Sequence, residues 1–234
     1  MTRSPGLTAA LVALLATPAL APAPGAAQEL FDRGVFVITR SGAEVGREEF
    51  ALRAATGRGA AGLLAVATTR VDGREIQRAL EVTRDYVPVS FQQTETSGGR
   101  VVARVSAQLS GIRLSARSSS PEGETAREFP VRPPVIILSD DAFSAFYFVP
   151  RPDSGEERRV TVVDPAAARS QAGTVDLVGP DSVTVAEQRV AARHFRLRVG
   201  SDERHFWFTA SGDLMQISQP SRNVIATRSE APRH

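Results

Sequence analysis

The sequence contains neither cysteine nor lysine, and all 28 of its basic residues are arginine. Without cysteine the protein has no disulfide, no thiolate nucleophile, no thiolate-bound zinc or iron–sulfur site and no lipid-modified cysteine. Without lysine it has neither a Schiff base nor the phosphate-binding lysine of a P-loop. These absences exclude several classes of enzyme and leave a short list of functions open.

The chain also carries little net charge. Its 28 basic and 26 acidic residues give a formal net charge of +2. The pI of about 9.8 reflects the shortage of groups that titrate between histidine and arginine, not an excess of positive charge. The arginines are scattered beside acidic residues, as in Arg47-Glu48-Glu49. This pattern favours a solvated, salt-bridged sheet face and predicts no nucleic-acid partner.

The first 27 residues have the features of a secretory signal peptide. Arg3 supplies the positive start, residues 7–16 form a short apolar run, and small residues up to Ala27 offer cleavage sites. Three prolines interrupt the apolar run before it reaches the roughly 20 residues that a membrane-spanning helix needs. We therefore expect cleavage near Ala27, export to the periplasm or beyond, and a single domain over residues 28–234 with no transmembrane segment.

From Leu30 onward the chain consists of short segments rich in Val, Ile, Leu, Phe and Thr, separated by turn residues. The predicted turns are Ser41-Gly42, Asp72-Gly73, Gly98-Gly99, Ser110-Gly111, Glu122-Gly123, Gly179-Pro180, Ser201-Asp202 and Ser211-Gly212. Such residues suit tight hairpins because they tolerate positive φ. The sequence thus predicts a mainly all-β protein, in which a strongly curved antiparallel meander forms an open or half barrel with one short helix packed against it.

The last hairpins indicate which face of this sheet is buried. Turns centred on Ser201-Asp202 and Ser211-Gly212 place Phe195, Phe206 and Phe208 on one face of three neighbouring strands, because side chains alternate with a period of two. We expect this aromatic stripe to face the core.

The opposite face of the same strands carries His194 and His205. The assumed register offsets the two histidines and places Arg196 directly across from Trp207, which permits a cation–π contact. A metal site would need further ligands, and the nearby carboxylates lie in the turn. The sequence therefore predicts exposed or half-buried histidines, no metal and no cofactor.

Helical periodicity occurs at Ser139–Val149, where Phe143, Phe146 and Tyr147 are spaced i, i+3, i+4. Two interpretations are open: a helix that plugs the open end of the curved sheet, or one wall of a pocket for an apolar ligand. The candidate pocket residues are Ile137, Phe143, Phe146, Tyr147, Phe195, Phe206 and Phe208.

Asp140 and Asp141, followed by Ser144, also permit two interpretations. Paired carboxylates act in catalysis when burial and convergence keep one of them protonated. Adjacent residues rarely converge in this way, so we favour a structural role in which Ser139 or Asp140 caps the helix, Asp141 complements its dipole and Ser144 faces solvent.

Several segments resemble a group of exported bacterial β-rich proteins classed as a domain of unknown function. The segments are Gly34-Val35-Phe36-Val37-Ile38 with Gly42, Glu44-Val45-Gly46 with Phe50, Asp140-Asp141-Ala142-Phe143-Ser144-Ala145-Phe146-Tyr147, and Phe206-Trp207-Phe208 with Gly212-Asp213-Leu214. The resemblance implies a strongly bent antiparallel sheet similar to that of periplasmic envelope-integrity proteins and, more distantly, of lipoprotein carriers. Some relatives carry a disulfide that this chain cannot form, and the group has no catalytic residues to map here.

Three functions follow from these patterns. The first is a non-catalytic exported protein of the bacterial cell envelope that binds a lipid-like or other apolar molecule, or an envelope partner. The second is a structural or interaction module with a filled core, whose edge strand pairs with another protein. The third is an envelope hydrolase that uses Asp140 or Asp141 with a histidine, which requires a histidine and a carboxylate within hydrogen-bond reach in a cleft.

Overall fold

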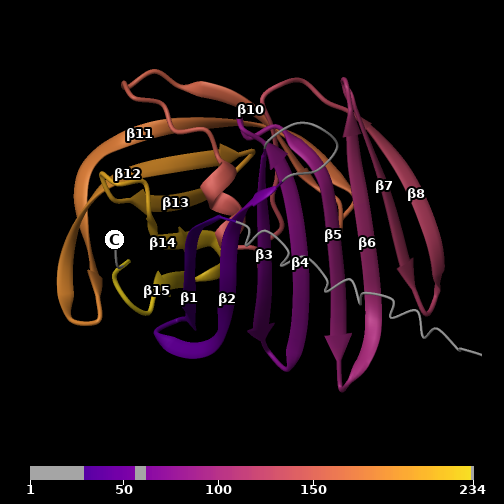
Figure 1. Cartoon of the computed structure of the whole chain (residues 1–234), viewed down its shortest axis with the longest axis horizontal. Helices are drawn as coiled ribbons and strands as arrows, with labels where there is room; N and C mark the ends of the chain where they lie inside the picture. Colours follow the sequence, from indigo (N-terminus) through magenta and orange to yellow (C-terminus); the bar gives the residue numbers. More distant parts are fainter. Residues whose placement is uncertain (1–28, 56–61, 233–234) are drawn as a thin grey trace, which may run out of the picture.

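The computed structural model describes residues 29–55 and 62–232, which form one curved sheet of 15 strands (Figure 1). The predicted signal peptide and its cleavage site lie outside these residues. The first run of strands comprises β1 (Leu30–Arg40), β2 (Ala43–Ala55), β3 (Gly62–Val71), β4 (Arg74–Thr83), β5 (Pro88–Ser97), β6 (Arg100–Ser110), β7 (Arg113–Ser120) and β8 (Gly123–Pro130). The second run comprises β9 (Val135–Ile137), β10 (Arg158–Asp164), β11 (Arg169–Val185), β12 (Gln188–Val199), β13 (Asp202–Phe208), β14 (Leu214–Gln219) and β15 (Val224–Arg228).

The strand order explains why the sheet stays open. The strands from β1 to β8 pair antiparallel with their neighbours in sequence, as do those from β10 to β15, and β15 returns to pair with β1. The short strand β9 pairs parallel with β10 and forms one edge, while β8 forms the other. This arrangement confirms the predicted curved, mainly antiparallel sheet that does not close into a barrel. No helix in the described part of the chain is long and apolar enough to cross a membrane.

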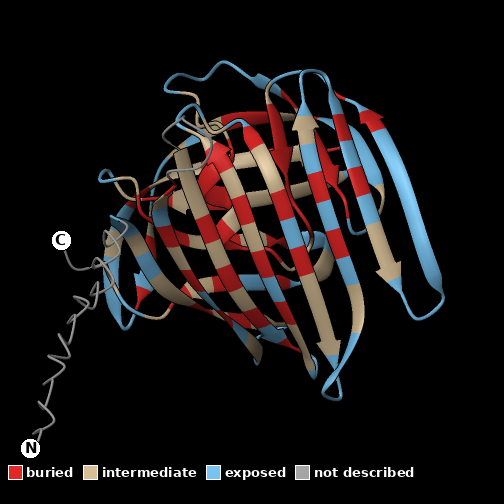
Figure 2. Ribbon diagram, turned by 45° about the vertical axis from the view of Figure 1, so that its right-hand side comes forward, coloured by how far each residue is buried: buried red, intermediate tan, exposed pale blue. Residues whose placement is uncertain are grey.

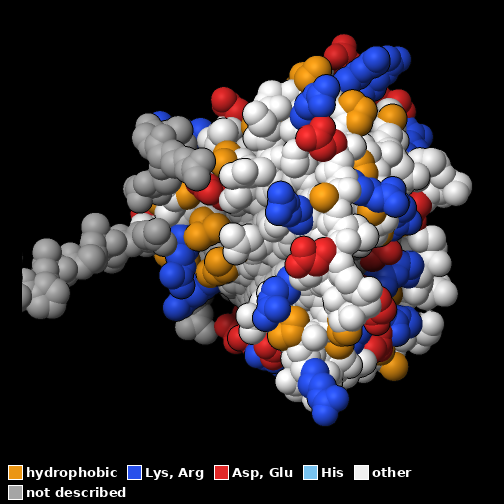
Figure 3. Space-filling view, turned by 90° about the vertical axis from the view of Figure 1, so that its right-hand side faces the viewer, with side chains coloured by type: hydrophobic (Ala, Val, Ile, Leu, Met, Phe, Trp, Pro, Cys, Tyr) orange, Lys and Arg blue, Asp and Glu red, His pale blue; other side chains and the backbone are white. Residues whose placement is uncertain are grey.

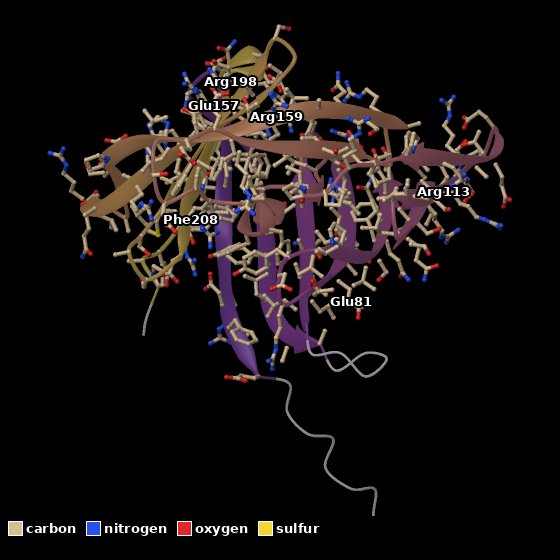
Figure 4. The ribbon with its side chains drawn as sticks, turned by 90° about the horizontal axis from the view of Figure 1, so that it is seen from above. Glu81, Arg113, Glu157, Arg159, Arg198 and Phe208 are labelled. Atoms are coloured by element: carbon tan, nitrogen blue, oxygen red, sulfur yellow. The ribbon has the colours of Figure 1, made fainter. Side chains whose placement is uncertain are left out.

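The core lies on the concave side of the sheet. Buried and exposed residues alternate along the strands (Figure 2), as expected when one face packs and the other meets water. Figure 4 shows side chains filling the space between the two halves of the sheet, with Phe208 among them. On the outside of the second half, Glu157 and Arg198 form an ion pair.

The segment Ser139–Val149 does not form the predicted α-helix. Its regular part is a single 3-10 turn, η1 (Ser144–Phe148). Neither Ser139 nor Asp140 caps it, and Ser144 is buried instead of facing solvent. The reason is that the sheet surrounds the segment, so side chains on several of its sides pack inward and its free N–H groups are satisfied by the sheet. We call Ser139–Val149 the plug segment.

The last hairpins confirm the predicted faces but shift one register. The turn between β12 and β13 lies at Gly200 and Ser201, so Phe195 pairs with Phe206 instead of Phe208. Gly200 adopts a φ of 60°, which glycine tolerates better than other residues. Because the register changes by two residues, the faces are preserved, and Phe195, Phe206 and Phe208 are buried together as expected.

Two irregularities create a second, smaller core on the outer face. A register shift at the end of β13 pairs Phe208 with Leu214. Met215, the next residue, is therefore buried on the face opposite the aromatic stripe. Met215 instead packs with Val183 and Val185. The strand β11 reaches this position through an irregularity between Leu177 and Gly179, where we had predicted a turn at Gly179-Pro180. The tip of the β11–β12 hairpin thereby covers the outer surface of β13 and β14.

Candidate functional site

The candidate pocket residues lie together in one hydrophobic core. The rings of Phe146 and Phe206 are 5.5 Å apart between centroids, and those of Tyr147 and Phe208 are 5.6 Å apart. The cavity beside the plug segment, lined in part by Ile137, measures only about 20 Å³. A space of that size holds about one water molecule. The aromatic positions that suggested a ligand pocket are thus filled by the chain itself.

Glu48 holds the start of the 3-10 turn η1 within the plug segment. This residue of β2 is fully buried, and its carboxyl oxygens accept hydrogen bonds from the backbone N–H groups of Phe143 at 3.1 Å and Ser144 at 2.6 Å. The hydroxyl of Thr69 on β3 donates to the same carboxyl at 2.8 Å. Glu48 therefore takes the place of the predicted side-chain cap, although it lies far from the turn in sequence.

Arg78 extends this buried polar cluster across the sheet. Its guanidinium donates to the Thr69 hydroxyl and to the backbone carbonyl of Asp141, both at 2.9 Å, and to the side chain of Gln93. Burial lowers the pKa of Arg78, and the nearby charges of Glu48 and Asp141 oppose that shift. Arginine stays protonated in proteins, so these hydrogen bonds stabilise a buried positive charge.

Asp140 and Asp141 form the centre of a network of arginines. The carboxylate of Asp141 accepts from Arg222 at 2.9 Å and Arg74 at 3.1 Å, and that of Asp140 accepts from Arg204 at 2.8 Å. The backbone carbonyl of Asp140 also accepts from Arg222. Each aspartate is thus paired with basic groups, not with a second carboxylate. The paired-carboxylate interpretation is wrong, and so is the expected dipole role.

A third polar cluster holds the other end of the plug segment. The Tyr147 hydroxyl bonds to Asp32 of β1 and accepts from the backbone N–H of Leu214 at 3.0 Å. Arg228 of β15 forms a two-pronged ion pair with Asp32 at 2.7 and 2.8 Å. Burial, together with the charge of Asp32, holds the pKa of Tyr147 well above its usual range, so the phenol stays protonated.

Gly34 makes room for that ion pair. A Cβ atom at this position would lie 3.0 Å from the Arg228 guanidinium, closer than ordinary contact. Together the three clusters tie strands from both halves of the sheet to one segment. They leave its apolar side chains packed and its polar groups bonded.

The histidines lie on the outer face, away from the plug segment. His194 Nε2 and His205 Nδ1 are 2.8 Å apart and share a hydrogen bond, whereas the predicted register kept them apart. His194 stacks on Trp207 at 4.4 Å, in the place where we had expected Arg196. The Trp207 indole in turn donates to Asp181 of the covering hairpin at 2.8 Å.

This geometry does not assemble the hydrolase considered above. Asp140 and Asp141 lie among inward-facing arginines such as Arg204, while His205, the next residue on β13, points to the opposite face. Among residues 29–55 and 62–232, no group of three or more His, Asp or Glu side chains is placed to hold a metal ion. The histidine pair is therefore best explained as part of the packing beneath the hairpin.

The histidine pair predicts a loss of stability in mild acid. Burial lowers the pKa of His194 and His205, and for His194 the charge of its partner lowers it further, against the opposing carboxylates of Asp181 and Glu203. The unfolded chain then binds more protons, so this contribution to stability is present above the ordinary histidine pKa of about 6.5 and is lost as the pH falls below it.

Urea unfolding at pH 7.5 and pH 5.5 measures this effect. The native protein should lose more stability over this range than a variant that carries His194→Gln and His205→Gln, in which the titrating groups are absent. An equal loss in both proteins would show that other groups cause the pH dependence.

The free edge strand β8 is the remaining unusual feature. It is eight residues long, and its first six residues are all exposed (Figure 2). It pairs only with β7 among the described strands, with no break in register along its length. Figure 3 shows this end of the molecule, where acidic and basic side chains are interspersed without a large area of one sign.

Fold and core together define a β-barrel-like protein whose interior is filled by its own chain. No model of a known family and no curated protein sequence matches it. Among solved structures it is similar to a β-barrel-like DUF1849 protein from Brucella abortus, with a TM-score of 0.50, 11% identity, and coverage of 84% of this chain and 94% of that one. A DUF1089 family protein from Pseudomonas aeruginosa aligns with a TM-score of 0.39 and 12% identity over 89% and 97% of the two chains. The first similarity supports the fold alone, and it agrees with the expected β-rich class of unknown function.

Proposed function

We propose that this protein is a non-catalytic component of the bacterial cell envelope that binds another protein by pairing its free edge strand β8 with an extended segment of the partner. The observation that carries the proposal is the contrast between a filled interior and an open sheet edge. Strand addition is an established way in which sheets bind peptides, because the unpaired N–H and C=O groups of the edge continue the ladder. The signal-like start of the sequence supports the location.

The two edges of the sheet differ in a way that favours β8. The strand β9 has three residues, all buried, and lies near β5 inside the curved sheet. The strand β8 is long, regular and exposed, and its proline, Pro130, stands at its last position. Charged side chains are one of the devices by which natural proteins blunt exposed edges, and β8 carries them, but β8 is neither short nor bulged and has no internal proline.

An apolar ligand is the second candidate, favoured by the aromatic residues that surround the plug segment. Binding among these aromatic residues would require the plug segment to leave the core, since the cavity beside it holds about one water molecule. That movement would break the hydrogen bonds of Glu48 and Tyr147. The filled state therefore favours the interaction module over the carrier.

Site-specific crosslinking in the native envelope separates the two candidates. A photo-crosslinking amino acid at Ala126, exposed on β8, should give discrete protein adducts. The same group at Gln92 is the control, because Gln92 is exposed on β5, a strand that is paired on both sides. Native mass spectrometry of the purified protein is the second arm. Adducts at both positions or at neither would contradict the proposal, and a co-purifying lipid without adducts would favour the carrier.

A further inference from the structure

The side chains of β8 divide into two faces with different charges. Phe129 is buried against Leu114 of β7, so the residues that alternate with it, including Arg127, point to the concave side. Glu124, Ala126 and Glu128 point outward. The free edge therefore presents acidic groups four residues apart on its outer face and a basic group on its inner face.

Two of these three charges have no partner within the described protein. The side chains of Glu124 and Arg127 form no ion pair or hydrogen bond there, whereas many arginines of the sheet are paired. Glu128 contacts Arg113 at 2.9 Å, but both side chains are more than half exposed. Ion pairs of that kind contribute little to stability. These exposed charged side chains are therefore free to form ion pairs with a partner strand.

A second copy of this chain is a poor occupant of the edge. In a symmetric antiparallel pair, a two-fold axis perpendicular to the sheet keeps each side chain on its own face. The residue at the axis then lies opposite the same residue of the second copy. A residue a given number of positions before it lies opposite the residue the same number of positions after it. A pair centred on Ala126 places Glu124 opposite Glu128. A pair centred on Glu124, Arg127 or Glu128 places that residue opposite itself.

Like charges directly opposite each other on neighbouring strands are destabilising. The remaining central register, centred on Thr125, places Glu124 opposite Ala126 and Gly123 opposite Arg127, so within the strand it has no like-charge pair and no opposite-charge pair either. Four of the five central registers are therefore repulsive and none forms an ion pair between the copies, so the charge pattern disfavours self-association through β8 while leaving its backbone groups free.

We infer that the partner of β8 is an antiparallel strand of complementary charge, with basic side chains opposite Glu124 and Glu128, an acidic side chain opposite Arg127 and an apolar side chain opposite Phe129. This inference rests on the proposed function and specifies its partner. In the N-to-C direction the partner strand follows the pattern apolar, basic, acidic, small, β-branched, basic. The matched peptide Val-Lys-Glu-Thr-Val-Lys, with blocked ends, has this pattern.

Fluorescence anisotropy of the labelled peptide with the intact protein tests the inference. The control is Val-Glu-Lys-Thr-Val-Glu, in which each charge is reversed. Cross-strand charge pairs contribute roughly 0.2–1 kcal/mol each, so three matched pairs against three like-charge pairs predict a preference of about tenfold. In the double variant Glu124→Lys with Glu128→Lys two of the three pairs change sign, so the preference should reverse and shrink to about twofold. Both replaced residues are exposed, so the fold is expected to persist.

A backbone control distinguishes strand pairing from simple charge attraction. N-methylation of alternate residues of the matched peptide, on the side that would bond to β8, should abolish binding because it removes ladder donors. Equal affinity for the matched and reversed peptides, or no binding of either, would overturn the inferred partner chemistry. If Ala126 still gives protein adducts in the envelope, the proposed function survives that result. If it gives none, both fail.

Discussion

Replacing Glu48 with leucine is expected to lower the free energy of unfolding by about 3–5 kcal/mol, the range for removing one partner of a buried charged pair. The substitution removes the acceptor of the Phe143 and Ser144 backbone N–H groups and leaves Arg78 with one fewer counter-charge. Buried donors without acceptors are costly, because they gave up water and gain nothing in return. Urea denaturation followed by circular dichroism measures the loss.

Glu49→Leu is the matched control, because it changes the same residue type at the next position of β2. Its side chain is 63% exposed and, among the residues that the structure describes, pairs only with the exposed Arg70. We expect a change within about 0.5 kcal/mol. Equal losses in the two variants would mean that Glu48 does not anchor the plug segment. Increased binding of an apolar dye by Glu48→Leu alone would show that the segment has loosened.

The second large effect is expected at Arg228. Arg228→Met leaves the Asp32 carboxylate beside Tyr147 in a site where the Asp32 side chain is 11% exposed. An uncompensated buried charge should cost about 3–5 kcal/mol at neutral pH. Urea denaturation followed by circular dichroism at pH 7.5 measures this loss.

Arg53→Met provides the comparison, since Arg53 is an exposed arginine of β2. It should change the unfolding midpoint only slightly. Gly34→Val offers an independent route to the same cluster, because the added side chain would displace the Arg228 guanidinium. A Gly34→Val protein as stable as the native one would argue against a tightly packed ion pair.

Alternation of residue types was enough to predict the faces of the strands. Phe195, Phe206 and Phe208 share a face under any register that differs by two residues, so an error in the turn centre did not change the predicted core residues. The same error hid the histidine pair. Whether His194 meets His205 depends on the register itself, and the turn residues Gly200, Ser201 and Asp202 left more than one centre open.

The buried polar residues were missed although a signal was present. Glu48 is in phase with Phe50 and Leu52 on β2, and Arg78 is in phase with Ile76 and Leu80 on β4. The period of two therefore placed both charged side chains inward. We interpreted Arg47-Glu48-Glu49 as solvated because charged residues are seldom buried without a partner, and the partner of Glu48 is the backbone of a distant segment.

The sequence alone determined the hairpin strands, their inward faces and the apolar character of the plug segment, because these depend on side-chain alternation and turn chemistry within a few residues. The tertiary structure alone decided that the plug segment fills the interior, which groups hold it, and which sheet edge stays free. Those outcomes depend on contacts between residues far apart in the chain, such as Glu48 with Ser144 and Asp32 with Arg228. These contacts depend on how the curved sheet brings its strands together, and the spacing of residues along a short segment does not reveal them.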